Sequence, residues 1–303
     1  MYKIGIIDTM KDKGINLLKS YKDFDCEIVT DLSRENLLLK LPEFDGITLR
    51  RGKIDREILS NCDKLKVIAR HGVGYDSVDT KCLKEKGITL LVAHNSTSTS
   101  PAEHIMFMIM NIYKGVSMFD TMVRNGDFVK AIHLNIEQNF ELFDKTVLIA
   151  GFGRIGKKLI KKCLGFDMKV LVFDPYVDDV TIASFGGVKI ATLEEGLKKA
   201  DILSLSLPLN AETKNFITLK EMKLMKKSSI IINAARGGVV NEEDLNNALD
   251  NNIIAFAGID VFEKEPPEST NPLITNKKVV LSPHSATFTK EGLENMAVET
   301  AQN

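Results

Sequence analysis

The chain has 303 residues, 44% of them hydrophobic, which is enough for two domains that each bury a core. Its 40 basic and 41 acidic residues give a net charge of -1, so the composition excludes the positive field that attracts nucleic acid or an anionic membrane. No apolar run reaches the roughly 18 residues of a membrane span, and the N-terminus lacks the pattern of a signal peptide. The cysteines have neither the spacing of a zinc pair nor that of a disulfide framework, which predicts no metal site and a reduced, cytoplasmic protein; they are Cys26, Cys62, Cys82 and Cys163.

Short β-branched runs alternate with helical patterns from the N-terminus onward. The first series predicts five strands, at residues 2–8, 26–30, 45–50, 65–70 and 89–93. A second series of six apolar strands begins at residue 145. Because their side chains are apolar on both faces, we expect parallel sheets covered by helices on each side. The pattern predicts an α/β protein made of two open parallel-sheet units.

Two helical segments join the units. Residues 100–119 form a long apolar pattern opened by Ser100 and Pro101, and its Met and Phe side chains are expected in a core or a subunit interface. Residues 289–303 form a second helical pattern after the last strand, and we expect them to return to the first unit. The predicted division is therefore 1–98 plus 288–303 for one domain and 99–287 for the other.

The sequence GFGRIG, with Gly151, Gly153 and Gly156, lies between a predicted strand and a helix. These positions suit a tight turn, a close approach of the backbone to a pyrophosphate, and contact between helix and strand. The helix N-terminus adds N–H groups and a positive dipole end. Asp174 ends the next strand, where a carboxylate can accept hydrogen bonds from the adenosine ribose and repels the extra phosphate of NADP. The loop therefore predicts binding of NAD.

Three later strands end in polar side chains that a buried sheet does not require. Arg236 follows the strand SSIIINAA, Asp260 ends IIAFAGID, and His284 follows KKVVLSP. Glu265 lies in the loop beyond Asp260. Ligands of open α/β sheets bind beyond the carboxyl ends of the strands, so we expect these four residues on the same edge as the glycine loop.

With these motifs in order, the sequence resembles the D-isomer-specific 2-hydroxyacid dehydrogenases, in their phosphoglycerate dehydrogenase-like branch. The resemblance covers about residues 70–287 and depends on RHGVGYDSVD, SPAEH, GFGRIG with Asp174, SLPL, NAARGGVV, GIDVFEKEPP and SPHSA. It implies a Rossmann NAD-binding domain inserted into a flavodoxin-like substrate-binding domain.

The resemblance also implies catalytic roles. His284 would be the general acid/base, a role that suits imidazole because its unperturbed pKa of about 6.5 lies near working pH. Glu265 would bind the other ring nitrogen and stabilise the imidazolium. Arg236 would bind the substrate carboxylate and polarise the C2 carbonyl. Asp260 would lie beside the nicotinamide and influence the His–Glu pair.

Binding residues follow from the same motifs. Arg50 and Arg70 match arginines near the distal phosphate of the substrate in phosphoglycerate dehydrogenases, whereas Arg51 replaces the small hydroxyl residue usual in that branch. The expected substrate is D-3-phosphoglycerate or a relative such as hydroxypyruvate or glycerate. The predicted substrate-binding set is Arg50, Arg70, Val73, Gly74 and Arg236. The predicted cofactor-binding set is Gly151, Gly153, Arg154, Ile155, Gly156, Asp174, Leu207, Pro208, Ala234, Ala235, Asp260, His284 and Ala286.

Each assignment has a structural alternative. Arg236 could cap a helix, Glu265 could be solvated, His284 could be a core histidine, and Arg50 and Arg70 could be solvated strand ends. Among the other histidines, those at 71, 94 and 133 are expected in loops or at the surface. His104 is expected on a helix behind the site and outside the catalytic set.

Two other functions share these motifs. A non-enzymatic NAD-sensing interaction protein would use the same fold to report cofactor binding, and a formate or phosphite dehydrogenase relative would share the NAD site. The expected partners are a small-molecule 2-hydroxy or 2-keto acid and a second copy of the chain, in a homodimer or tetramer, with no nucleic acid and no membrane.

Overall fold

The computed structural model describes residues 1–134 and 139–303. The chain divides into two compact units, unit 1 with Met1–Thr97 and Thr287–Asn303, and unit 2 with Ser98–Ala286. The assignment of one unit to substrate and the other to cofactor stays a prediction at this point. No helix of the described residues is both long and apolar enough to pass through a bilayer.

Unit 1 contains a five-stranded parallel sheet in the order β2-β1-β3-β4-β5. This is the strand order of flavodoxin-like folds, so the predicted class of this unit is confirmed. Its elements are β1 (Tyr2–Ile7), α1 (Asp12–Ser20), β2 (Phe24–Val29), α2 (Arg34–Lys40), η1 (Leu41–Glu43), β3 (Gly46–Leu49), α3 (Arg56–Ser60), β4 (Val67–Arg70), α4 (Thr80–Lys86), β5 (Thr89–Val92) and α14 (Lys290–Gln302).

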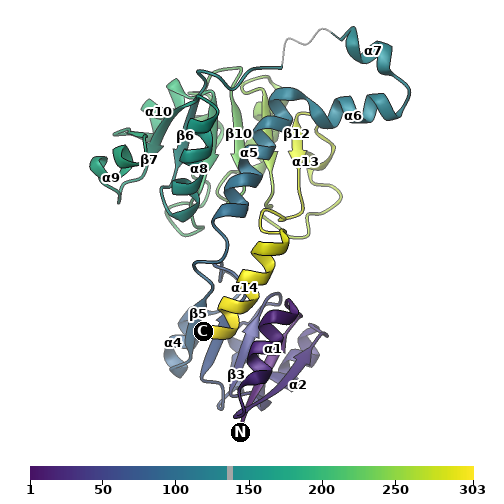
Figure 1. Ribbon diagram of the computed structural model, residues 1–303, viewed down its shortest axis with the longest axis vertical. Helices are drawn as coiled ribbons and strands as arrows, with labels where there is room; N and C mark the ends of the chain where they lie inside the picture. The colour runs from purple at the N-terminus through teal and green to yellow at the C-terminus, as the bar shows by residue number, and fades with distance from the viewer. Residues whose placement is uncertain (135–138) are drawn as a thin grey trace. The chain divides into compact units, whose positions relative to one another are not determined.

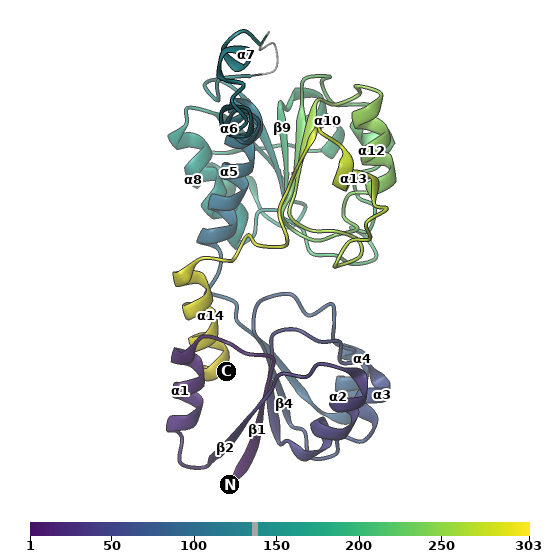
Figure 2. The ribbon, with the colours of Figure 1, turned by 90° about the vertical axis from the view of Figure 1, so that its right-hand side faces the viewer.

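Helices cover both faces of this sheet. Helices α1 and α14 lie side by side on one face, although about 270 residues separate them, and α2, α3 and α4 lie on the other (Figure 2). The sheet has a hydrophobic core on each face, and consecutive strand residues point to opposite cores. Ile6 packs with α1 and α14, whereas Ile7 packs with the helices of the other face. The C-terminal helix is therefore part of the N-terminal unit.

Unit 2 contains a seven-stranded parallel sheet in the order β12-β11-β10-β9-β6-β7-β8. The strand order reverses between β6 and β9, as in a Rossmann fold, which confirms the predicted class. Its elements are α5 (Thr99–Lys114), α6 (Val116–Arg124), α7 (Phe128–Ile132), β6 (Thr146–Ala150), α8 (Arg154–Gly165), β7 (Lys169–Phe173), α9 (Asp179–Ser184), β8 (Val188–Lys189), α10 (Leu193–Lys199), β9 (Ile202–Leu205), α11 (Leu219–Met222), β10 (Ile230–Asn233), α12 (Glu242–Asp250), β11 (Phe256–Ile259), α13 (Pro272–Thr275) and β12 (Val279–Leu281).

The strands of unit 2 are buried on both faces. Val147 and Ile149 of β6 pack on the side of α5 and α8, whereas Leu148 and Ala150 pack on the side of α10 and α12. Figure 2 shows α5 and α8 on one face of the sheet and α10 and α12 on the other, and in Figure 1 the helices α5 and α8 lie in front of the strands. This double burial explains why the strands are apolar runs without alternation in the sequence.

The prediction of one helix over residues 100–119 is wrong. Helix α5 ends at Lys114, and α6 begins at Val116 after Gly115, whose φ of +62° places it in the left-handed region. Its N–H bonds the carbonyl groups of Asn111 and Ile112, a glycine-based helix end. The apolar pattern continued through Gly115, which concealed the break.

Candidate active site

The glycine loop follows β6 and leads into α8, with two glycines that exclude any side chain. Gly151 has a φ of +95°, and a Cβ atom there would lie 2.5 Å from the carbonyl oxygen of Ser206. A Cβ at Gly156 would lie 2.6 Å from the carbonyl oxygen of Gly151. A Cβ atom at Gly153, by contrast, would meet no other described residue within 4 Å. The loop is thus packed at its base and open at its tip, next to the N-terminus of α8, and this cradle fits a pyrophosphate.

Asp174 follows β7 and holds the glycine loop. Its Oδ2 accepts a hydrogen bond from the backbone N–H of Phe152 (2.7 Å), and its Oδ1 accepts one from that of Tyr176 (2.8 Å). Each carboxylate oxygen can accept a further bond, which the hydroxyl groups of a ribose could supply. The fixed, half-buried carboxylate fits NAD.

His284 and Glu265 form a hydrogen-bonded pair at the same edge. Nδ1 of His284 lies 2.7 Å from Oε2 of Glu265, whose Oε1 accepts the N–H of Phe262 (3.1 Å). Burial raises the pKa of Glu265, but the hydrogen bond and charge of His284 outweigh it and lower the pKa. Nε2 of His284 makes no hydrogen bond with the described part of the chain. The imidazole is oriented through one nitrogen and offers the other to a ligand.

Asp260 is fully buried between these loops. Its Oδ1 accepts from the hydroxyl of Ser282 (2.5 Å) and the N–H of Ser285 (2.8 Å), and its Oδ2 accepts from the N–H of Ala286 (3.0 Å). Burial alone would raise the pKa of Asp260, but hydrogen bonds from His104, Ser282 and the backbone lower it to about 2. The carboxylate therefore stays ionised and organises the segment that carries His284.

Arg236 follows β10 in a turn that Asn233 braces. The Asn233 side chain accepts the N–H of Ala235 (3.1 Å) and donates to the carbonyl of Arg236 (3.0 Å). Gly237 touches the loop after β11 so closely that a Cβ there would lie 1.8 Å from the carbonyl oxygen of Phe262. The turn of Arg236 and the loop of Glu265 are thus packed backbone to backbone.

The other predicted cofactor residues of unit 2 lie at the carboxyl ends of its strands or in the first turn of α8. Half-buried Leu207 and exposed Pro208 follow β9, and Ala234 and Ala235 are buried after β10. The remaining members are Arg154 and Ile155, which begin α8, and buried Ala286 beyond β12.

In unit 1 the predicted carboxylate-binding loop follows β4. Gly72 has a φ of +128°, and the N–H groups of Val73 and Gly74 make no hydrogen bond with the described residues. Val73 is 39% exposed. Two adjacent N–H groups without protein acceptors are suited to an anion.

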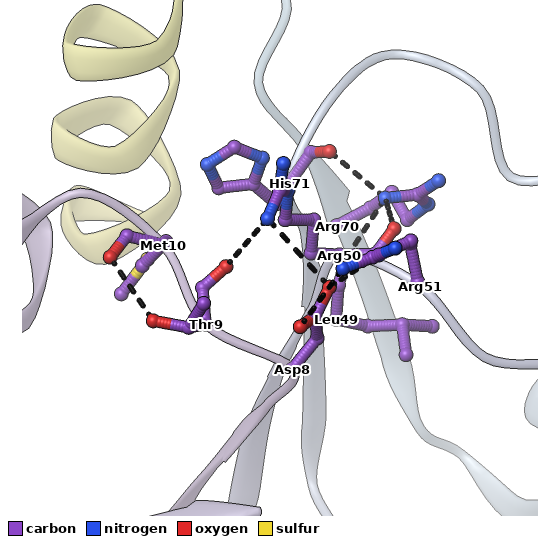
Figure 3. A network of polar contacts seen from close by, with 8 residues as sticks. All are labelled: Asp8, Thr9, Met10, Leu49, Arg50, Arg51, Arg70 and His71. Atoms are coloured by element: carbon purple, nitrogen blue, oxygen red, sulfur yellow. Dashed lines mark hydrogen bonds and ion pairs between the residues drawn. The ribbon is translucent and has the colours of Figure 1, made fainter. Parts of the chain in front are cut away.

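The side chains of Arg50 and Arg70 differ in their contacts (Figure 3). Nη1 of Arg70 donates to the carbonyl oxygens of Leu49 (2.9 Å), Arg50 (2.6 Å) and His71 (2.8 Å), which fastens the ends of β3 and β4 together. Nη1 of Arg50 donates only to the carbonyl of Thr9, at 3.3 Å. Neither arginine is a freely solvated strand end, and Arg50 is held more loosely.

Asp8 and Arg51 complete this network. Nε of Arg51 donates to Oδ2 of Asp8 at 2.6 Å, and Nη1 of Arg50 lies 3.7 Å from the same oxygen. Burial raises the pKa of Asp8, but Arg51 and a backbone bond lower it overall. Counting Asp8 with Arg50, Arg51 and Arg70, the cluster carries a net charge of +2.

His71 lies in the loop that follows β4, as predicted, but its side chain is buried and not at the surface. The residue is only 6% exposed, and its Nε2 has no hydrogen-bond partner among the residues that the structure describes. Burial, and then the charges of Arg50 and Arg70, lower its pKa to about 4. His94 and His133 are exposed as predicted.

The sequence did not assign a role to several residues that hold the site. Asn233 belongs to the NAARGGVV motif, but the motif predicts no role for it. Ser282 and Ser100 lie at the ends of a predicted strand and a predicted helix, and these positions predict no contact with the site. A polar residue inside a buried apolar run, as at Asn233, was the available signal. Ser100 bonds Ala286 and His104 bonds Ser282, over 186 and 178 positions of the sequence. No pattern in the sequence predicts these two hydrogen bonds.

Comparisons with known proteins agree with this geometry. The family model for the D-isomer specific 2-hydroxyacid dehydrogenase, NAD binding domain, matches residues 106–286. The chain is 34% identical over 292 residues to D-3-phosphoglycerate dehydrogenase of Methanocaldococcus jannaschii, covering 96% of this chain and 54% of that protein. It is 33% identical to glyoxylate reductase of Pyrococcus furiosus, covering 99% and 90%. A solved protein of Thermus thermophilus matches with a TM-score of 0.88 and 27% identity, covering 99% and 95%.

The matches also show how much of the relatives the chain covers and which cofactor it uses. The chain spans about half the length of the phosphoglycerate dehydrogenases that it matches. The matched domain contains the glycine loop, Asp174 and His284, so NAD is the cofactor of unit 2.

Proposed function

Because the chain belongs to the D-isomer specific 2-hydroxyacid dehydrogenase family, we propose that it is an NAD-dependent oxidoreductase acting on a small D-2-hydroxy acid and its 2-keto acid. The observation that carries the proposal is the 2.7 Å contact of His284 with Glu265, on the sheet edge that also bears the glycine loop. NAD supplies or accepts the hydride at C2 of the substrate.

His284 is the proposed general acid/base. In reduction, its Nε2 gives a proton to the substrate oxygen, and in oxidation the same nitrogen takes the proton back. Glu265 supports the protonated ring through Nδ1, where the geometry is already set. Asp260 keeps the backbone around His284 in place through the N–H groups of Ser285 and Ala286.

Arg236 is the proposed anchor of the substrate carboxylate. A planar guanidinium can hold a carboxylate through two parallel hydrogen bonds. The backbone contact of Gly237 with Phe262 supports this assignment, because it fixes the turn of Arg236 relative to the loop of Glu265.

Unit 1 is the proposed substrate-binding domain. The N–H groups of Val73 and Gly74 suit a carboxylate, and the net positive cluster with Arg50 and Arg70 suits a second anionic group. A substrate such as D-3-phosphoglycerate has both groups. Hydroxypyruvate and glycerate are the alternatives within the same class, since relatives include D-3-phosphoglycerate dehydrogenases as well as glyoxylate reductases.

The decisive experiment is a substrate panel. Purified protein with NADH is mixed with 3-phosphohydroxypyruvate, hydroxypyruvate, glyoxylate or pyruvate, and the loss of NADH absorbance is followed. The expected result is turnover of at least one acid, with 3-phosphohydroxypyruvate giving the highest kcat/KM. Binding of NADH without any turnover would favour a non-enzymatic NAD-sensing protein instead.

Cofactor choice tests the NAD site separately. We expect NADH to be used at least about tenfold better than NADPH, because Asp174 repels a 2′-phosphate. Replacing Asp174 by Ser should lower the ratio of activity with NADH to activity with NADPH. A wild-type preference for NADPH would contradict the proposed role of Asp174.

We propose a homodimer formed through α5, α6 and α7. These helices carry several exposed apolar side chains, and α6 has no buried residue. The exposed side chains include Phe107 (55%), Val116 (55%), Phe128 (58%), Val129 (65%) and Ile132 (61%). Light scattering should give twice the mass of the chain, and the double variant F128E/V129E should give the mass of one chain. A wild-type monomer would contradict the proposal.

A cytoplasmic location is proposed from the cysteines. All four carry free thiols, and three of them are buried. A reducing compartment keeps thiols in this state. Fractionation of cells that produce the protein would test the location.

A further inference from the structure

The segment from Ser282 to Ala286 carries His284 in an unfavourable backbone conformation. His284 has a φ of +51°, in the left-handed region that non-glycine residues seldom adopt. Such a conformation persists only where the surroundings determine it. The N–H of His284 donates to the carbonyl of Asp260 (2.7 Å), and the next two N–H groups donate to the Asp260 side chain. One buried residue thus receives three bonds from the turn.

Helix α5 holds the same segment from the other side. The hydroxyl of Ser100 donates to the carbonyl of Ala286 at 2.6 Å, and this contact is buried. Nε2 of His104, one helical turn further, lies 2.9 Å from the hydroxyl oxygen of Ser282 and 3.4 Å from Oδ1 of Asp260. Residues four positions apart lie on one helix face, so both side chains meet the two ends of the five-residue segment.

The number of available protons fixes the direction of the bond between His104 and Ser282. A serine hydroxyl has a single proton, and Ser282 donates it to Asp260 over 2.5 Å. Asp260 already accepts two backbone N–H groups and stays ionised, so it cannot donate to Ser282. The hydroxyl oxygen of Ser282 must therefore accept from His104, which requires a proton on Nε2 of His104.

We propose that His104 is a positioning residue that acts on His284 through Ser282 and Asp260. Its Nε2–H orients the hydroxyl of Ser282 toward Asp260, and Asp260 then holds the turn at His284. The contacts link His104 of α5 to Ser282, just beyond β12, and Ser282 to Asp260, at the end of β11. All of these residues belong to unit 2. This inference rests on the proposed role of His284 as acid/base.

The first test compares two replacements of His104. Leu fills a similar space but cannot donate, whereas the amide of Gln can donate from nearly the position of Nε2. H104L should lower kcat for the best keto acid of the panel about tenfold, with little change in KM for NADH. H104Q should retain most of the wild-type kcat. A role in packing alone would make the two variants equal, and an unchanged kcat in H104L would overturn the proposal.

The second test uses coupling to Ser282. S282A should lower kcat about as much as H104L, and the double variant H104L/S282A should lose little more than either single variant, because all three lack the same bond. Multiplicative losses in the double variant would mean that the two residues act independently, which would overturn the proposal.

The third test does not require activity. In wild-type protein with ¹⁵N-labelled histidine, NMR distinguishes a proton on Nε2 from one on Nδ1, and H104Q assigns the signal. We expect Nε2–H on His104, and a neutral ring with its proton only on Nδ1 would overturn the proposal. Near-normal turnover in H284A would instead refute the acid/base role and leave the His104 measurement to stand by itself.

Discussion

His71 in unit 1 and His284 in unit 2 each lie just beyond the carboxyl end of a parallel strand, yet their environments are opposite. His71 is 6% exposed and lies near the positive charges of Arg50 and Arg70, and no residue of 1–134 or 139–303 forms a hydrogen bond with its Nε2. The side chain of His284 is 46% exposed and contacts the carboxylate of Glu265. Burial and cationic neighbours disfavour protonation of His71. The surroundings of His71 thus favour the neutral ring, whereas Glu265 binds one ring nitrogen of His284 and leaves the ring partly exposed.

The neighbouring side chains differ in the same way. At the end of β4, Arg70 uses its Nη1 to bind three backbone carbonyl groups, so the contacts stabilise the loop itself. At the ends of β11 and β12, the bonds of Asp260 hold a turn whose histidine presents a nitrogen outward. The two strand ends thus differ in what their hydrogen bonds hold, which is the backbone of the loop itself at β4 and the turn that carries His284 at β11 and β12.

Among the variants proposed here, H284A should show the largest loss of activity. Loss of a general acid/base should reduce kcat by at least about a hundredfold, because positioned proton transfer contributes about 10²–10⁴-fold. Steady-state kinetics with NADH and the best keto acid measures it. The matched replacement H133A, in an exposed loop, should leave kcat unchanged. Near-normal turnover in H284A would remove the catalytic assignment.

His71 should affect stability instead. Its folded pKa of about 4 lies below the unfolded value of about 6.5, so the unfolded state binds the proton first as the pH falls. Stability is therefore full above pH 6.5 and decreases toward pH 4, by about 2 kcal/mol between pH 7 and pH 5. Urea unfolding followed by circular dichroism at both pH values tests this. H71Q should flatten the decrease, and an identical slope in H71Q would contradict the prediction.

The variant G237A tests the backbone contact between the turn of Arg236 and the loop of Glu265. A methyl group there would collide with the carbonyl of Phe262, so G237A must displace the turn of Arg236 or the loop of Glu265. We expect kcat/KM for the keto acid to fall about tenfold. Gly165, where a Cβ would meet nothing within 4 Å, provides the control G165A. Equal kinetics in the two variants would show that the contact does not position the site.

Arg50 should give the smallest and most selective effect. With R50M, the KM for the phosphorylated substrate 3-phosphohydroxypyruvate should rise about fivefold and the KM for glyoxylate should stay unchanged, because only the former has a distal anion. R56M is the control, since Arg56 pairs with Glu85 elsewhere on unit 1. Equal changes for both substrates would remove Arg50 from the substrate site.

The architecture of each unit could be read from the chain alone. Apolar runs of strand length, separated by amphipathic helices, specify parallel sheets, because local periodicity decides which residues are buried. The glycine loop, Asp174 and the polar strand ends were recognisable because each lies at a fixed offset from a strand. The break at Gly115 was missed, since apolar periodicity continues through a residue whose left-handed φ ends the helix.

By itself, then, the sequence determined the two sheets, the cofactor loop and the polar residues that follow the strands of unit 2, all of which depend on short-range spacing. Only the tertiary structure decided that His71 is buried and that Arg70 binds backbone carbonyl groups. It also decided that Ser100 and His104 hold a turn more than 170 residues away. These features depend on burial and on hydrogen bonds between distant segments, and no local pattern encodes which distant groups meet.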